Sequence, residues 1–218
     1  MSTKSFNASL LTACVLLASA SPASASGYKF TDLGTIGASY RESWASGINN
    51  SGQVAGDSIT SDGTFRATIW NGTTPTDRGT LGGRASEAFG INNAGQVVGN
   101  SYILGNTGVH ATIWNGTTPT DLGTLGGSYS EARGINNSGQ VVGYSYTSGN
   151  ATSYAIIWNG TTPTALGTLG GSNSWASGIN NSGAVVGGSY TSGDATYHAT
   201  IWNGAPPTDL GTLGGGAL

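Results

Sequence analysis

Short apolar segments alternate with polar turns along most of the chain, and residues 131–169 show the pattern clearly. Apolar, β-branched and aromatic residues predict four strands there, at 131–136, 140–146, 153–158 and 164–169. The turns between them are rich in Asn, Ser and Gly, and glycine readily adopts the positive φ that tight turns need. Antiparallel strands joined by such short connections predict a four-stranded meander.

The meander repeats about every 44 residues, which is the first feature to look for in a sequence of this kind. The tetrad Gly-Ile-Asn-Asn begins at four positions that are 43 or 44 residues apart: Gly47, Gly90, Gly134 and Gly178. An Ile-Trp dipeptide ends the third strand of each unit, and we expect its four tryptophans to pack between units: Trp70, Trp114, Trp158 and Trp202. The approximate repeats are 39–83, 84–127, 128–171 and 172–215, within a single repeat domain of residues 26–218.

Four-stranded units of this length predict an all-β fold and favour a β-propeller-like array of four antiparallel repeats. Residues 28–33 match the last strand of a unit, so one extra N-terminal strand is expected there. The alternatives are an open β-repeat array or a β-solenoid, although Asn-Gly turns indicate hairpins rather than parallel coils. Four units plus one strand fit a ring with an exchanged closing strand, or an incomplete ring truncated from a longer parent. An open ring leaves an unpaired strand edge.

The N-terminus resembles a secretory signal peptide, with Lys4, an apolar run over residues 8–20 and the small-residue pattern Ala23-Ser24-Ala25. Residues 1–25 are therefore predicted to be removed on export, leaving an extracellular or cell-surface protein, with the periplasm as an alternative location. The run is too short for a transmembrane span. Cys14 is the only cysteine, and the apolar run continues beyond it, so a lipid anchor at Cys14 is not expected.

Composition and charge limit the classes of partner and of secondary structure that are expected. The net charge is −3, and the seven Lys and Arg residues are scattered, so the clustered positive surface that nucleic-acid binding requires is not predicted. Glycine accounts for 38 of 218 residues and charged residues for 8%, which favours turns and strands over helices.

The string from Gly134 to Gly143, with Thr-Asp-Leu-Gly-Thr-Leu-Gly-Gly at Thr120–Gly127, resembles the HAF-repeat family of extracellular bacterial proteins. The family's His-Ala-Phe triplet is only partly kept, because Phe is absent throughout and His stands at two of the four positions: Arg66, His110, Tyr154 and His198. The resemblance implies export and tandem repeats, and it implies no catalytic residues.

No metal, cofactor or nucleophile site is predicted. His110 and His198 lie two repeats apart, too far to share an ion in a ring, and neither has an acidic residue close by in the sequence to suggest a Ser-His-Asp arrangement. We interpret both as strand-entry positions. The aspartates of the Thr-Asp-Leu-Gly motif are expected at turns or strand edges rather than around Ca²⁺: Asp32, Asp77, Asp121 and Asp209.

Residues that differ between repeats are the candidates for ligand binding. Glu87 and Glu131 occupy the repeat position at which Trp44 and Trp175 stand in the other two units. A second set consists of Tyr129, Tyr154 and Tyr197, with the loops near Asn106, Asn150 and Asp194. Aromatic rings beside amides and carboxylates suit sugars, since binding sites combine apolar faces with a few polar groups. The simpler interpretation of Glu87 and Glu131 is a solvated rim.

The sequence favours a secreted or cell-surface, non-enzymatic module that binds polysaccharide or another extracellular protein, or that has a structural role. One alternative is a polysaccharide-active hydrolase or lyase that uses Glu87 and Glu131, since paired carboxylates cleave glycosidic bonds. Another is a fragment of a longer repeat protein.

Overall fold

The computed structural model describes residues 27–39, 41–204 and 206–214. The chain divides into two compact units, Met1–Thr31 and Asp32–Leu218, and all of the strands belong to the second. The predicted signal peptide and Cys14 lie outside the described residues. Within the described part, no helix is long and apolar enough to span a membrane.

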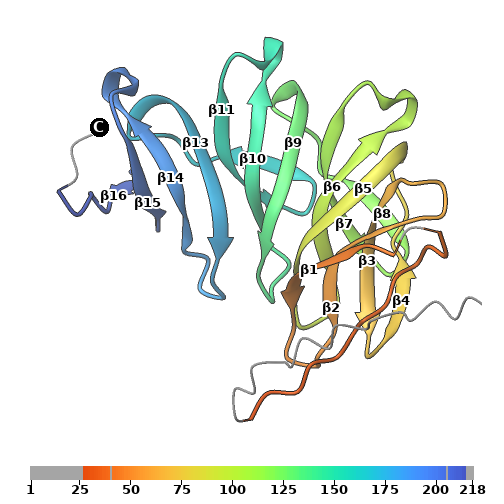
Figure 1. Ribbon diagram of the computed structural model, residues 1–218. Coiled ribbons are helices and arrows are strands. Elements are labelled where there is room, and N and C mark those ends of the chain that lie inside the picture. Colours follow the sequence, from red (N-terminus) through yellow and green to blue (C-terminus); the bar gives the residue numbers. More distant parts are fainter. Residues whose placement is uncertain (1–26, 40, 205, 215–218) are drawn as a thin grey trace, which may run out of the picture. The chain divides into compact units, whose positions relative to one another are not determined.

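In its described residues, the unit Asp32–Leu218 is all-β, as predicted, apart from three one-turn 3₁₀ helices. Each repeat contributes four strands, which follow one another along the chain (Figure 1). The strands are β1 (Ser43–Ile48), β2 (Val54–Ile59), β3 (Phe65–Asn71), β4 (Thr74–Asp77), β5 (Gly82–Ile91), β6 (Val97–Ile103), β7 (Val109–Asn115), β8 (Thr118–Asp121), β9 (Gly126–Ile135), β10 (Val141–Thr147), β11 (Ser153–Asn159), β12 (Thr162–Ala165), β13 (Gly170–Ile179), β14 (Val185–Thr191), β15 (Tyr197–Trp202) and β16 (Thr208–Asp209). The 3₁₀ helices are η1 (Leu104–Asn106), η2 (Ser148–Asn150) and η3 (Ser192–Asp194).

Every repeat is an antiparallel meander in which each strand pairs with the next in sequence. The first and last meanders, β1–β4 and β13–β16, form separate four-stranded sheets. The middle two join into one eight-stranded sheet through a single parallel pair, Val109 with Tyr129, between β7 and β9. The predicted antiparallel meander is therefore confirmed.

The predicted strand limits need correction at both ends of a repeat. In the third repeat the first strand begins at Gly126, not at residue 131, and the last strand ends at Ala165 rather than at residue 169. Pro163, expected to lie in the turn, pairs with Trp158 instead. This is possible because β12 is an edge strand, where the missing N–H of proline is tolerated. Gly170 and Gly171, which directly follow the predicted strand 164–169, begin the next strand, β13.

The extra N-terminal strand predicted at residues 28–33 is not formed, since these residues lie outside every strand of the structure. They repeat the sequence of a fourth strand, but in each repeat that strand pairs with the third strand just before it. No third strand precedes residues 28–33 within the described part of the chain, so the sequence match alone does not form a strand.

The hydrophobic core lies between successive repeats. Between the first two, Ala55, Ala67 and Ile69 of one repeat pack against Ala88 and Trp114 of the next. The same positions recur at the other two junctions. The four repeat tryptophans are between 0% and 3% exposed: Trp70, Trp114, Trp158 and Trp202. Each repeat therefore has one face that receives the preceding repeat and an opposite face that receives the following one.

The Asn-Asn turns tie the repeats together by hydrogen bonds. The Asn92 Oδ1 atom accepts the N–H groups of Ala94 and Gln96, which shapes its own turn, while Asn92 Nδ2 donates to the carbonyl of Asn136 at 3.1 Å. Equivalent bonds link Asn49 to Asn92 and Asn136 to Asn180. These contacts bury the side chains of Asn49, Asn92 and Asn136 with polar partners.

The glycine of the Gly-Ile-Asn-Asn tetrad allows the first strands of neighbouring repeats to approach each other closely. A Cβ atom on Gly134 would lie 3.3 Å from the Cα of Gly178 in the next repeat and 3.3 Å from Val142 Cγ2. A side chain there would be tighter than an ordinary contact, so one of these neighbours would have to move by a few tenths of an ångström.

Candidate functional site

The variable repeat positions meet in a row of cross-strand pairs. On the first two strands of successive repeats, Trp44 faces Asp57, Glu87 faces Asn100, Glu131 faces Tyr144 and Trp175 faces Gly188. Directly opposed residues of paired strands have their side chains on the same face of the sheet. The binding candidates thus belong to a face on which chemistry differs from repeat to repeat over a constant scaffold.

A hollow of about 340 Å³ lies where this row passes from the first repeat to the third. Its lining includes Phe65 of β3, Glu87 of β5, Asn100 and Tyr102 of β6, and Tyr129 of β9. We call it the larger hollow, because a smaller one adjoins it at Tyr129.

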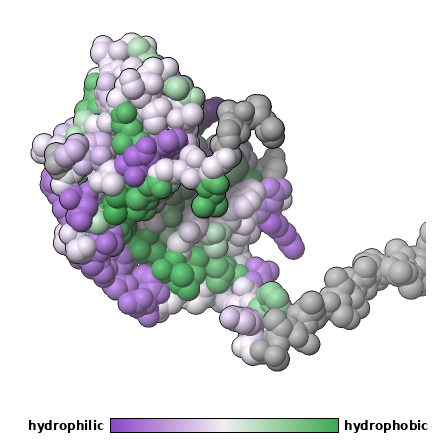
Figure 2. Space-filling model, turned by 90° about the vertical axis from the view of Figure 1, so that its left-hand side faces the viewer, coloured by the Kyte–Doolittle hydropathy of each residue, from purple (hydrophilic) through white to green (hydrophobic). Residues whose placement is uncertain are grey.

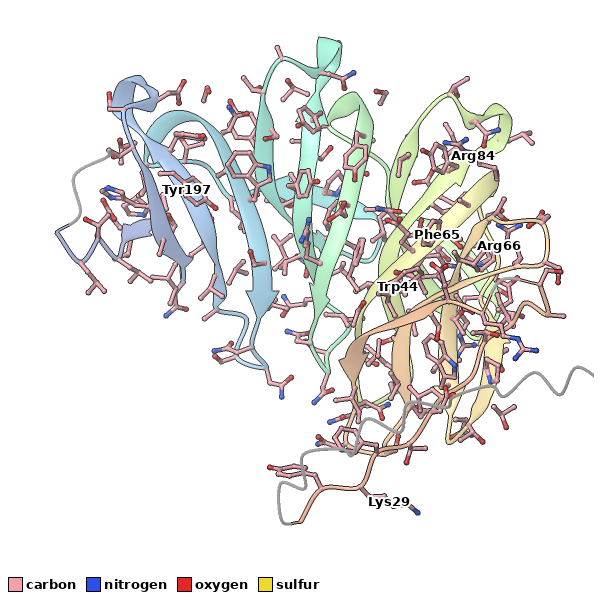
Figure 3. The ribbon with its side chains drawn as sticks, in the orientation of Figure 1. Lys29, Trp44, Phe65, Arg66, Arg84 and Tyr197 are labelled. Atoms are coloured by element: carbon pink, nitrogen blue, oxygen red, sulfur yellow. The ribbon has the colours of Figure 1, made fainter. Side chains whose placement is uncertain are left out.

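Arg84 completes one wall of the larger hollow. Its guanidinium carbon lies 4.7 Å from the centre of the Tyr102 ring, and its Nη2 donates to the Tyr102 hydroxyl at 3.1 Å. Figure 3 places Arg84 near the loop end of β5 and β6, with Phe65 and Trp44 close together below it. A cation, a carboxylate and aromatic rings therefore face one space.

A second hollow of about 280 Å³ adjoins it and shares Tyr129. This smaller hollow is lined by Ser128, Tyr129, Tyr144, Tyr146 and Asn150. The ring centres of Tyr129 and Tyr144 are 5.9 Å apart and nearly parallel, and Tyr146 meets both edge-on. Tyr129 consequently has one hollow on each side of it.

Glu131 holds Tyr129 and Tyr144 in place through their hydroxyl groups. Its side chain is only 4% exposed, and Glu131 Oε2 accepts hydrogen bonds from the Tyr129 hydroxyl at 2.6 Å and from Asn100 Nδ2 at 3.3 Å. Tyr144 donates a longer bond of 3.4 Å to the same oxygen. The prediction that Glu131 belongs to a solvated rim is therefore wrong, because the neighbouring repeat and the tyrosines cover it.

Arg133 neutralises the buried carboxylate. It is the extra residue of a β-bulge in β9, and such bulges redirect a side chain. Its Nε lies 2.5 Å from Glu131 Oε1, and its guanidinium lies 5.9 Å from the centre of the Tyr144 ring. A buried charge requires such a partner. Glu131 is thus a structural support for the tyrosines.

Burial and the nearby carboxylate affect the tyrosine hydroxyls. Burial, and then the hydrogen bond to Glu131, raise the pKa of Tyr129 well above its ordinary value. Burial and the charge of Glu131 raise the pKa of Tyr144 as well. Both hydroxyls therefore remain protonated donors at every physiological pH, which suits hydrogen bonding rather than nucleophilic chemistry.

A second carboxylate, missed in the sequence, lies beside Glu87. Asp57 is 9% exposed, and its Oδ1 accepts the N–H of Ala88 at 2.7 Å. Burial raises the pKa of Asp57 to about 7, and the charge of Glu87 contributes to the increase. Alignment of the repeats could have identified Asp57, because it occupies in the first repeat the position that Asn100 occupies in the second.

Glu87 and Glu131, considered as a possible pair, are separated by Asn100. Asn100 faces Glu87 across the strand pair and donates to Glu131 from its side-chain amide. The two glutamates therefore differ in environment, with Glu87 half-buried at the larger hollow and Glu131 sealed beneath the tyrosines.

Two further aromatic clusters lie in the end repeats. In the first, the Trp44 and Phe65 ring centres are 5.5 Å apart. In the last, Trp175 packs against Tyr190 and Tyr197 at 5.9 and 5.6 Å. Trp44 and Tyr197 are 47% and 51% exposed, so both keep a free ring surface.

Tyr154 does not belong with Tyr129 and Tyr197. It faces Ser145, whereas Tyr197 faces Tyr190, the counterpart of Tyr146. Since Tyr146 faces Ser153, the true equivalent of Tyr197 is Ser153. A shift of one residue places a strand side chain on the opposite face of the sheet. Tyr154 instead packs against the core between repeats.

The loop residues Asn106, Asn150 and Asp194 are structural. Each has a positive φ of 55° to 57°, which asparagine and aspartate tolerate better than most residues. Their Oδ1 atoms accept the N–H groups of Arg84, Ser128 and Ser172, which fixes the first strand of each repeat to its loop.

Both histidines have acidic partners that are distant in the sequence and that the sequence analysis did not identify. His110 Nδ1 lies 2.8 Å from Asp121 Oδ2, and His198 Nδ1 lies 2.8 Å from Asp209 Oδ2. The residues are 11 positions apart but face each other on the third and fourth strands. Within the residues that the structure describes, no group of three His, Cys, Asp or Glu side chains is arranged to hold a metal ion.

Neither a comparison with models of known protein families nor one with curated protein sequences gives a match for this chain. Its function is therefore inferred from the geometry of the two hollows.

Proposed function

We propose that the chain is a secreted or cell-surface, non-enzymatic module that binds an extracellular polysaccharide through the two hollows that flank Tyr129. The observation that carries the proposal is the position of Tyr129 itself, half-buried between the hollows with its hydroxyl fixed 2.6 Å from Glu131. A ring held rigidly at a surface loses little conformational entropy when a ligand stacks on it.

The surrounding groups fit a sugar polymer. Sugar rings present apolar C–H faces to aromatic rings and hydroxyl groups to amides and charged side chains. The larger hollow offers Phe65 and Tyr102 with Asn100, Glu87 and Arg84. The smaller hollow offers three tyrosines with Ser128 and Asn150. Two adjoining sites suit neighbouring units of one polymer chain.

We also propose that the four meanders are successive blades of a propeller-like array, built on repeats similar to the HAF family. In support, the Asn-Asn turns of all four repeats line one further hollow of about 340 Å³. Its lining comes from the ends of the first strands, which would be the innermost strands of such blades. Export is proposed from the signal-peptide pattern of residues 1–25.

The test is binding of the purified chain to a panel of soluble extracellular polysaccharides, with released reducing ends and unsaturated products measured in the same tubes. The proposal predicts saturable binding to at least one polymer without product. Tyr129→Ala should weaken that binding at least tenfold, whereas Tyr28→Ala, which changes an exposed tyrosine outside the hollows, should leave it unchanged. A panel without any binding would contradict the proposal.

One observation favours a second candidate, a polysaccharide hydrolase or lyase. Asp57, whose pKa burial raises to about 7, accepts the N–H of Ala88 beside Glu87, and Glu87 lines the larger hollow. A protonated and an ionised carboxyl group are what general acid–base cleavage requires. Product release that disappears in Glu87→Gln and Asp57→Asn would establish this candidate in place of the first.

A further inference from the structure

The two ends of the repeat array carry complementary faces that are buried at every internal junction. One face belongs to the third strand of a repeat and includes Ala67, Ala111 and Ala155, each 0% exposed under the next repeat. The equivalent residue of the last repeat, Ala199, is exposed. Val186 and Leu210 are likewise 45% and 58% exposed, although their counterparts Val98 and Leu122 are buried.

The opposite face shows the same difference at the other end. Ala88, Ala132 and Ala176 of the first strands are at most 1% exposed because the preceding repeat covers them. The equivalent Ala45 is exposed, and Ile48 of the same strand is 69% exposed. Since Ala45 and Ala199 are both exposed, the two end faces do not cover each other within this chain.

The hydrogen-bonding groups of the two ends also match. At the internal junctions, a serine Oγ of the following repeat accepts the N–H of the recurring third-strand alanine, as Ser86 does from Ala67 at 3.1 Å. The same bond joins Ala111 to Ser130 and Ala155 to Ser174. In the first repeat, Ser43 donates to Gly34 as Ser86 does to Gly79, but it accepts no alanine N–H among the described residues.

The hydrogen bonds that link the Asn-Asn turns of successive repeats, which we call the Asn ladder, end in the same way. Asn180 Nδ2 has no partner within the described part of the chain, whereas Asn49, Asn92 and Asn136 each donate to the next repeat. The first repeat carries Asn49, which is buried, and Asn50, which is exposed, at the positions that such a ladder would meet next. Figure 2 looks onto the side that carries β13–β16, where hydrophobic side chains gather at the surface.

We infer that the face of the last repeat, around Ala199, binds the face of the first repeat, around Ala45, of a second copy of this chain. The occupant follows from the match, because the first repeat carries the same Ser, Ala, Gly and Asn that seat each internal repeat. The association is head-to-tail, so it forms a closed ring if the rotation closes and an open polymer if it does not. Trp70 of the first face is already covered within the chain, so the association is driven by burial of the exposed apolar residues of the two faces, such as Ile48 and Leu210.

The test is sedimentation velocity on the purified chain over a dilution series, using residues 26–218 only if the mass of the natural product shows that residues 1–25 are removed. The unchanged chain should form species larger than one chain. Ala45→Arg and Ala199→Arg should each sediment as single chains, since each variant lacks one of the two faces. Ala151→Arg, an exposed alanine of a loop, is the matched control and should assemble normally.

Mixing the two blocked variants gives the decisive result. Ala45→Arg keeps the last face and Ala199→Arg keeps the first, so an equimolar mixture should form dimers of twice the single-chain mass and nothing larger. Circular dichroism of each variant confirms folding. Single chains at every concentration of the unchanged protein, assembly that survives either substitution, or a mixture that stays monomeric would each overturn the inference. Sugar binding in the monomeric variants is measured separately, so the two proposals can fail independently.

Discussion

His198 Nδ1 lies 2.8 Å from Asp209 Oδ2, and the same pair recurs two repeats earlier as His110 and Asp121. In the first repeat Arg66 lies 3.7 Å from Asp77 at the equivalent positions. The third repeat has Tyr154 and Ala165 there, so the cation and the carboxylate are lost together. The variation at this third-strand position is therefore matched by its partner on the neighbouring fourth strand.

We predict that His198→Ala raises the pKa of Asp209 toward its ordinary value, because the hydrogen bond from His198 is the largest cause of its lowered pKa. A lowered pKa in the folded state means that the ionised carboxylate stabilises the fold above the ordinary pKa. That contribution disappears as the pH falls through the folded pKa. Carboxyl-carbon NMR titration of both proteins measures the shift, and equal pKa values would contradict the assignment.

Asp57 should destabilise the folded chain as the pH rises. Its pKa of about 7 is above the ordinary value of 3.8. Between pH 4 and pH 7 the folded state therefore holds a proton that the unfolded state has already released. Stability conferred by this group falls across that window, by at most about 4 kcal/mol.

Asp57→Asn keeps an acceptor for Ala88 and places there the residue that the next repeat has as Asn100. The variant should gain stability over the unchanged chain as the pH rises from 4 to 7, with a constant difference above about 8. Urea unfolding at a series of pH values provides the comparison. A difference that is independent of pH would show that Asp57 has the same pKa in the folded and the unfolded chain, and would contradict the raised value.

The Asn ladder predicts a difference between two identical substitutions. Asn92→Ala removes the bonds within its turn and the bond to Asn136, and should cost about 2–4 kcal/mol of unfolding free energy. Asn180→Ala removes only bonds within its own turn, to Ser182 and Ala184, and its cost should be smaller by about 1 kcal/mol or more. Denaturant unfolding at a dilution where the chain is single would measure both, and equal costs would argue against the ladder.

Gly134 and Gly178, the tetrad glycines of the third and fourth repeats, allow a second comparison between two identical substitutions. Gly134→Ala places a Cβ 3.3 Å from Gly178 Cα and should destabilise the chain by about 1–3 kcal/mol through overpacking. Gly178→Ala has no following repeat to meet, and its nearest neighbour, Val186 Cγ2, lies at an ordinary 3.6 Å. It should change stability by no more than about 0.5 kcal/mol in the single chain. Thermal unfolding of the two variants side by side makes the test.

The sequence predicted the meander and its repeat because both are set by local patterns. The Asn-Gly turns and the apolar strands specify which segments pair, and the recurring Ile-Trp marks the strand that becomes buried. Strand limits were harder to predict, since Gly126 and Pro163 join strands only through pairing that composition disfavours. Residues 28–33 have the sequence pattern of a fourth strand but form none, because no third strand precedes them in the described part of the chain to pair with.

The candidate site was predicted only in part. Tyr129 and Glu87 were identified from their variation between repeats, and both line the larger hollow. The burial of Glu131 could not be predicted, since it depends on Asn100 of another repeat and on two tyrosine hydroxyls above it. Tyr154 was misassigned because a difference of one residue in register, invisible in the order of aromatics along the chain, decides which face a side chain occupies.

The most direct test of the polysaccharide site is calorimetric titration of the chain with the polymer that it binds best in the panel. We expect saturable binding in the unchanged protein and in Tyr28→Ala, with an affinity at least tenfold lower in Tyr129→Ala, which corresponds to about 1.4 kcal/mol or more. If Tyr129→Ala binds as tightly as the unchanged chain, or if no polymer binds at all, the hollows beside Tyr129 are not a polysaccharide site.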